Sequence, residues 1–108
     1  MSSSLVESAA PHATEVRVTE DTVYVELADG RSISAPTAWY PRLLHATLAE
    51  RSSWRLIGGG QGIHWPAIDE DISIANLLRG QRSGESQNSL KKWLAGRKLR
   101  QTKKRTGR

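Results

Sequence analysis

Cysteine and phenylalanine are both absent from this chain of 108 residues. The lack of cysteine excludes a disulfide framework, a thiolate metal site and a cysteine nucleophile. No apolar run approaches the roughly 20 residues that a membrane helix needs. The first residues, MSSSLVE, have neither the basic nor the apolar region of a secretory signal. We therefore expect a cytoplasmic protein without membrane contact, and the length allows one small domain.

Positive charge is scarce in most of the chain and concentrated at its end. In residues 1–80, six arginines and no lysine stand against ten acidic residues, which gives a net charge of −4. In residues 81–108, ten lysines or arginines stand against one acid, Glu85, which gives +9. An acidic body with a basic end indicates two parts with different roles. A tail that only keeps the protein in solution is the alternative.

Alternating apolar residues predict three strands in the first third of the chain, near residues 16–19, 23–27 and 33–35. Between the second and third strands, Asp29-Gly30 predicts a tight hairpin, because a type I′ turn needs positive φ at both central residues. Pro36 lacks the N–H that a strand ladder needs, so it ends the third strand.

One helix and two further strands are predicted next. The apolar stripe from Tyr40 to Leu48 recurs at helical spacing, and Pro41 suits a first turn. Strands at 54–57 and 62–65 follow, with Trp54 and Trp65 expected to pack against the helix. A glycine-rich hairpin loop joins these two strands, and Ser73 is placed to cap a short helix near 74–79.

The resulting order, β-β-β-α-β-β-α, predicts an α+β fold. We expect a two-layer sandwich in which one small antiparallel sheet is covered by one main helix. The expected organisation is a disordered segment at 1–14, the α+β domain at 15–80, a linker at 81–88, a short helix at 89–96, and a disordered basic tail at 97–108.

No pattern predicts a catalytic residue, a cofactor site or a metal site. The Gly58–Gly62 loop lacks the lysine and the following helix of a phosphate-binding loop. His64 lies near the acidic segment Asp69–Asp71, and histidine with carboxylates can transfer protons or bind a metal. These acids can instead precede the helix near 74–79, whose dipole favours negative charge. A small enzyme that uses His64 and the acidic segment is the least favoured hypothesis.

An ordered set of short motifs supports a family resemblance. The motifs are Asp29-Gly30-Arg31, Pro41-Arg42-Leu43, Ala46-Thr47, Glu50-Arg51, Gly60-x-Gly62-Ile63-His64-Trp65-Pro66, Asp69-Glu70-Asp71-Ile72-Ser73 and Leu77-Leu78-Arg79-Gly80. Over about residues 15–80 this set resembles the domain of unknown function 2442 family. The resemblance implies a small prokaryotic α+β domain and supplies no catalytic residue.

The same resemblance suggests partners. Some members of that family resemble antitoxins encoded beside a small presumed toxin, and others carry a helix-turn-helix domain after this module. The 28 residues that follow Gly80 here are too few for such a domain. Any binding to DNA would therefore have to use the basic end.

Two binding hypotheses rank above catalysis. The first is a non-enzymatic protein-interaction module, antitoxin-like in one form, whose partner is a cognate small toxin-like protein. Its candidate contacts are Trp39, at a helix start, and Trp93, which sits among basic residues and can also dock its helix on the body. The second is a regulator that binds nucleic acid without sequence preference through Lys91, Lys92, Arg97, Lys98, Arg100, Lys103, Lys104, Arg105 and Arg108.

Overall fold

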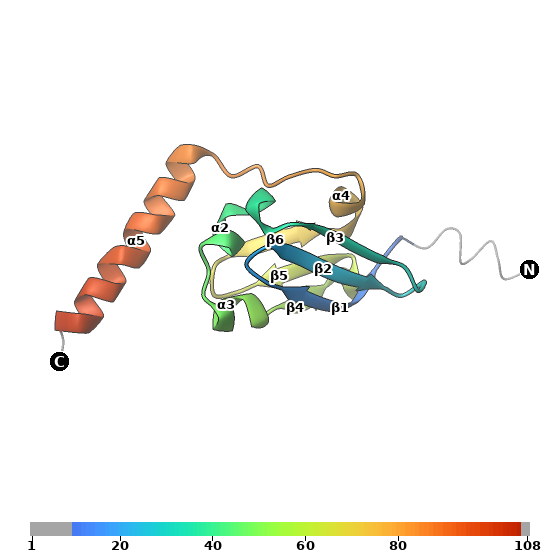
Figure 1. The fold of residues 1–108 in the computed structure, drawn as a ribbon, viewed down its shortest axis with the longest axis horizontal. Helices are drawn as coiled ribbons and strands as arrows, with labels where there is room; N and C mark the ends of the chain where they lie inside the picture. Colours follow the sequence, from blue (N-terminus) through green and yellow to red (C-terminus); the bar gives the residue numbers. More distant parts are fainter. Residues whose placement is uncertain (1–9, 107–108) are drawn as a thin grey trace, which may run out of the picture.

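The computed structural model describes the backbone of residues 10–106 and the side chains of residues 10–98. Its elements, in chain order, are β1 (Ala13–Val18), β2 (Thr22–Leu27), β3 (Ser32–Pro36), the 3-10 helix η1 (Thr37–Trp39), α2 (Pro41–Leu44), α3 (Leu48–Ser52), β4 (Arg55–Ile57), the 3-10 turn η2 (Gly58–Gly60), β5 (Gly62–Trp65), β6 (Glu70–Ser73), α4 (Ile74–Leu78) and α5 (Gln87–Thr106). The α+β class is confirmed. Figure 1 shows α5 beyond the end of the body that carries α2 and α3.

The first sheet contains β1, β2 and β3 in that order, all antiparallel. Its strands alternate as predicted, with Val16 paired to Val25 and both side chains buried. The strand β1 begins at Ala13, so residues 13 and 14 belong to the sheet and not to a disordered end. The hairpin near Gly30 is present, but its loop spans residues 28–31 and only Gly30 has positive φ, so it is not the expected type I′ turn.

A second antiparallel sheet contains β4, β5 and β6. The prediction of one sheet was wrong, because β4, β5 and β6 pair with one another and not with the first sheet. The acidic segment that begins at Asp69 leads into β6, a strand that was not predicted. On β6, Glu70 and Ile72 are buried while Asp71 and Ser73 are exposed. A carboxylate in an inward position hid the alternation that normally marks a strand.

The predicted glycine-rich hairpin between β4 and β5 is confirmed, and it packs against the first sheet. Gly60 has φ +93, and a Cβ atom there would lie 2.8 Å from the backbone oxygen of Ala13. Only glycine accommodates both this conformation and this approach without strain.

The single helix expected from Tyr40 to Leu48 is instead two short helices, α2 and α3. Thr47 and Glu50 explain the break. The Thr47 hydroxyl accepts from the Glu50 N–H at 3.1 Å, and the Glu50 carboxylate accepts from the Thr47 N–H at 2.8 Å. This capping box starts a new helix in the middle of the apolar stripe. The predicted cap of α4 is confirmed, since the Ser73 hydroxyl accepts from the Asn76 N–H.

One hydrophobic core joins the two sheets and the short helices. Trp65 is fully buried, at 0% exposure, and its Nε1 donates to the Arg51 backbone oxygen at 3.0 Å. This bond links the second sheet to α3. Trp39, Trp54 and Trp93 are partly buried and pack against the same core.

The largest departure from the predictions is α5, which runs for 20 residues and passes through Gly96. It replaces the end of the expected linker at 81–88, the short helix at 89–96 and most of the disordered tail at 97–108. Lysine, arginine, leucine and glutamine are good helix formers, and one interior glycine costs only about 1 kcal/mol. Cations in the last turn also interact favourably with the helix dipole. The disorder expected at residues 1–9 and 107–108 lies outside the described residues.

No helix in the described part of the chain is both long and apolar enough to cross a membrane.

Candidate functional site

The helix α5 gathers most of the predicted nucleic-acid contacts on one element. It contains eight lysines or arginines and no acid. Lys91, Lys92 and Lys98 are exposed, and Arg97 is partly buried. The backbone of α5 also carries Arg100, Lys103, Lys104 and Arg105, whose side chains are outside the described set, as is all of Arg108.

Trp93 docks α5 on the body. Its ring lies between two guanidinium groups, with 5.1 Å from the ring centroid to Cζ of Arg42 and 4.6 Å to Cζ of Arg97. The ring is partly buried and packs against the hydrophobic core. Each such contact is worth about 0.5–1 kcal/mol at an accessible site. The structure therefore places Trp93 at the junction of helix and body.

A bidentate ion pair fixes the segment that leads into α5. Arg42 Nε lies 2.7 Å from Glu85 Oε1, and Arg42 Nη2 donates to Glu85 Oε2 at 3.1 Å. Only 17% of the Arg42 side chain and 8% of the Glu85 side chain are exposed. Arg42 also donates to the Ile68 backbone oxygen at 2.9 Å. Its guanidinium holds the pKa of Glu85 below the usual range, so the pair stays charged at neutral pH.

A second bidentate pair holds the middle of α5. Both terminal nitrogens of Arg97 donate to the Glu50 carboxylate at 3.0 Å. The hydrogen bonds from Arg97 lower the pKa of Glu50. Glu50 is also the residue that completes the α3 capping box. Of the cations predicted to bind nucleic acid, Arg97 is thus already engaged within the chain.

Replacing Trp93 by alanine is expected to loosen α5 and leave the body folded. Only the ring contact with Arg42 joins α5 to the body, because Arg97 lies on α5 itself. That contact is worth about 0.5–1 kcal/mol, which corresponds to about a 2- to 5-fold change in the docking equilibrium. Hydrogen exchange followed by NMR would show faster exchange of α5 amides, with body amides unchanged. Ala95→Ser, at an exposed position of the same helix, is the matched control. Unchanged α5 protection would show that Trp93 does not anchor the helix.

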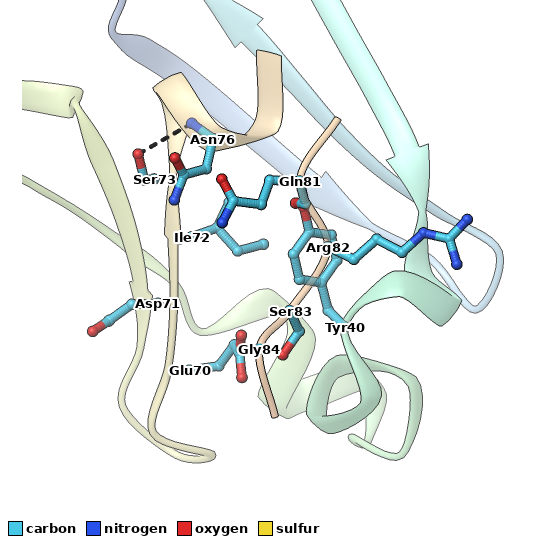
Figure 2. Close-up of a pocket in the computed structure, with 10 residues that line it drawn as sticks. All are labelled: Tyr40, Glu70, Asp71, Ile72, Ser73, Asn76, Gln81, Arg82, Ser83 and Gly84. Carbon is cyan, nitrogen blue, oxygen red and sulfur yellow. Dashed lines mark hydrogen bonds between the residues drawn. The ribbon is translucent and has the colours of Figure 1, made fainter. Parts of the chain in front are cut away.

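A separate polar cavity of about 160 Å³ lies between β6, the start of α4 and the segment 81–84 (Figure 2). The residues that line it, drawn as sticks, are Tyr40, Glu70, Asp71, Ile72, Ser73, Asn76, Gln81, Arg82, Ser83 and Gly84. The Tyr40 hydroxyl donates to the Gln81 backbone oxygen at 3.4 Å, so the segment crosses the ring of a buried tyrosine.

Glu70 is the unusual residue of this cavity, because it is 8% exposed and its side chain forms no hydrogen bond or ion pair with the described residues. The pKa of Glu70 is raised to about 7, mainly because the side chain is buried. The nearby carboxylate of Glu85 contributes to this rise, and Asp71 and Asp69 contribute less. Arg42 opposes the shift. No separate role was predicted for Glu70, although its two-residue spacing from Ile72 was a signal that its side chain faces inward.

His64 on β5 and Asp71 on β6 lie on the other face of the second sheet. They are cross-strand partners, and Nδ1 of His64 contacts Oδ1 of Asp71. The buried Glu70 and the exposed Asp71 alternate on the strand, so the acidic segment is divided between two faces. Within the described residues, no group of three or more histidine, aspartate or glutamate side chains could hold a metal ion.

Trp39, the other predicted partner contact, is the last residue of η1 and not part of α5. Its ring is partly buried, and the Arg82 guanidinium stacks over it with 4.9 Å from Cζ to the ring centroid. The structure thus gives Trp39 and Trp93 a similar environment, since each ring contacts arginine of the same chain.

The protein is expected to lose stability as pH rises from about 4.5 to about 7. Folding raises the pKa of Glu70 above its value in the unfolded chain, so the folded state binds this proton more tightly. The folding free energy that protonated Glu70 contributes is fully present below about pH 4.5 and is lost as the pH rises through 7. This loss is at most about 3 kcal/mol. Urea unfolding measured at several pH values checks this, and Glu70→Gln should flatten that window. Glu20→Gln, an exposed acid in the turn between β1 and β2, is the control. A Glu70→Gln profile identical to that of the parent would contradict the shift.

The family described as "Protein of unknown function (DUF2442)" matches residues 13–83. The chain belongs to this family. The resemblance inferred over about residues 15–80 is therefore confirmed. The DUF2442 match spans both sheets, Arg42 and every lining residue of the cavity except Gly84, and it ends before Glu85 and α5. We also expect residues 16–79 to fold without the two ends of the chain, and this stays a prediction.

Two solved structures share the DUF2442 fold of this chain. A protein of unknown function from Rhodospirillum rubrum, solved by crystallography, is 25% identical with a TM-score of 0.63, over 71% of this chain and 95% of that one. An uncharacterized protein from Chromobacterium violaceum, solved by NMR, is 22% identical with a TM-score of 0.60, over 88% of this chain and 83% of that one. No curated protein matches the chain.

Proposed function

We propose that this protein is a binding protein, not an enzyme, and that it binds nucleic acid without sequence preference through α5. The observation that carries the proposal is a 20-residue helix with eight cations and no acid, docked on an acidic body. A positive helix on a negative body orients the molecule toward a polyanion, because the field attracts at one end and repels at the other.

The dimensions of α5 suit a nucleic-acid groove. A helix of 20 residues is about 30 Å long, and its width with side chains is about 10–12 Å. The major groove of duplex DNA is about 12 Å wide and admits one helix. Positions 91, 98 and 105 recur every seven residues and so share one side of α5, with the exposed Lys91 at its start.

The affinity in this proposal comes from counterion release. Each phosphate that a lysine or arginine neutralises contributes about −0.9 to the slope of log affinity against log salt for duplex DNA, and about −0.7 for single strands. Arg97 is paired with Glu50, and not all other cations can reach phosphates at once. We therefore expect a total slope of about −3 to −5.

Replacing Lys91 and Lys92 by glutamine is expected to weaken binding and to reduce the duplex slope by up to about 2. Both side chains are exposed on α5, and neither is one of the two cations stacked on the Trp93 ring, which are Arg42 and Arg97. Fluorescence anisotropy with a labelled duplex of mixed sequence, read at several salt concentrations, measures both quantities.

The matched control for that pair removes the same charge from the body. Arg55 and Arg79 are exposed cations on β4 and after α4. Arg55→Gln with Arg79→Gln should leave the slope unchanged. Equal losses from the two double variants would mean that net charge, and not α5, determines binding.

A protein-interaction module, antitoxin-like in one form, is the other function proposed for this chain. It predicts stable capture of one small protein and no salt-dependent retention on nucleic acid. Absence of binding to duplex and single strands in low salt would favour it. Trp39 and Trp93, the two predicted contacts with a protein partner, already contact arginines of the same chain. The nucleic-acid proposal therefore has more support than the protein-interaction module.

A further inference from the structure

We propose that the cavity bounded by β6 and the segment Gln81–Gly84 is a binding site for a small organic cation with N–H donors, an alkylammonium or guanidinium group, held by the carboxylate of Glu70. This site lies on the body and is independent of the nucleic-acid contacts proposed for α5.

The first argument is the unused hydrogen-bonding capacity of Glu70. Its side chain lines the cavity, is more than nine-tenths buried, and has no partner among the described residues. Within that same part of the chain, no fully enclosed side-chain oxygen or nitrogen lacks a hydrogen bond. The Glu70 oxygens must therefore remain accessible from the cavity. A buried carboxylate without a partner is costly unless a donor reaches it.

The second argument is the charge around the cavity. Glu85, Asp71 and Asp69 all act on Glu70 as like charges, while Arg42 is the opposing cation. Arg42 is already paired with Glu85 through two hydrogen bonds. The Arg82 guanidinium is stacked over Trp39, and Figure 2 shows it extended away from Glu70. The charges of Arg42 and Glu85 largely offset each other in their ion pair, and the carboxylates of Asp71 and Asp69 remain, which favours a cation over a neutral donor at Glu70.

The third argument is the shape and chemistry of the wall. Glu70 lies beside Ser83 and Gly84 on one side, with the Tyr40 ring and Ile72 completing a less polar surface (Figure 2). A small cation can donate to the carboxylate and place its carbon atoms against these apolar groups. The volume, about 160 Å³, is near five times the roughly 30 Å³ of one liquid water, so only a few non-hydrogen atoms fit. A nucleotide or a folded segment is too large.

The test is an NMR titration of the full-length protein with ethylammonium chloride at pH 7.5. We expect saturable shifts at millimolar concentration in the amide resonances of Glu70, Gln81, Ser83 and Gly84. Tetramethylammonium and sodium chloride at equal ionic strength are the matched probes, because neither cation has an N–H donor. Glu70→Gln should abolish the saturable shifts, and Glu20→Gln should retain them. Nα-Acetyl-lysine amide, as a further probe, distinguishes a free amine from a lysine side chain as the natural source.

A second measurement holds even where Glu70→Gln fails to fold. The Glu70 carboxyl carbon of the parent protein is titrated with and without ethylammonium. Bound cation should lower the midpoint of that titration, whereas tetramethylammonium should leave it in place. Equal effects of all three salts, an unmoved midpoint, or saturable shifts that survive in Glu70→Gln would each overturn the proposal.

Discussion

Deletion of residues 99–108 is expected to remove most of the nucleic-acid binding and to leave the body folded. The deletion takes away five cations, Arg100, Lys103, Lys104, Arg105 and Arg108, and lowers the net charge from +5 to 0. It spares Trp93 and Arg97, so the remaining helix stays docked. With fewer phosphates neutralised, the magnitude of the duplex salt slope should decrease to about 2 or below. The affinity near 0.1 M salt should drop more than about tenfold.

The same anisotropy assay as for Lys91 and Lys92 measures this effect, with thermal unfolding as the control for folding. A melting temperature within a few degrees of the full chain would show that the deletion acts on binding alone. Undiminished binding by the shortened protein would place the contact on the body. A missing salt slope in the full chain would exclude counterion release as the source of affinity.

Trp65→Ala is expected to cost about 3–5 kcal/mol of folding free energy. The side chain is fully buried in the core shared by both sheets, and its Nε1 hydrogen bond to Arg51 is lost as well. A small domain has only about 5–15 kcal/mol in total. The variant should therefore be largely unfolded or very unstable in urea, as read by far-UV circular dichroism.

Trp54→Ala is the comparison for that experiment, because Trp54 is only partly buried at the edge of the same core. It should cost clearly less than Trp65→Ala, since less area is lost from the interior. Equal costs at the two positions, or an unchanged melting temperature for Trp65→Ala, would contradict the central role of Trp65.

The strands with an apolar alternation and the helix cap at Ser73 were predictable from the sequence, whereas a strand with a buried carboxylate and a helix break inside an apolar stripe were not. The first sheet follows from the alternating valines, and the cap of α4 follows from Ser73. The strand β6 was missed because Glu70 occupies a buried position, which no alternation of apolar residues reveals. The break between α2 and α3 depends on the Thr47–Glu50 capping box, which interrupts an otherwise continuous stripe.

The charges of the candidate site were predictable from the sequence, but the continuous helix that carries them and its ion pairs with the body were not. The separation of acidic body and basic end is visible in the sequence, and so is the isolated Trp93 among cations. The continuity of α5 was not, because Gly96 and the density of charge pointed to disorder. Two ion pairs join residues far apart in the sequence: Arg42 with Glu85, 43 positions apart, and Arg97 with Glu50, 47 positions apart. No local sequence pattern predicts such contacts.

Glu50 takes part in both the cap of α3 and the ion pair that holds α5. Its carboxylate closes the first turn of α3 and also receives both hydrogen bonds from Arg97. A phosphate group that competes for Arg97 would leave Glu50 with the helix cap alone. Thermodynamic linkage is reciprocal, so whatever changes the stability of the α3 cap must also change the affinity of α5 for that phosphate. The first turn of α3 is therefore a reporter, within the body, of what α5 is bound to.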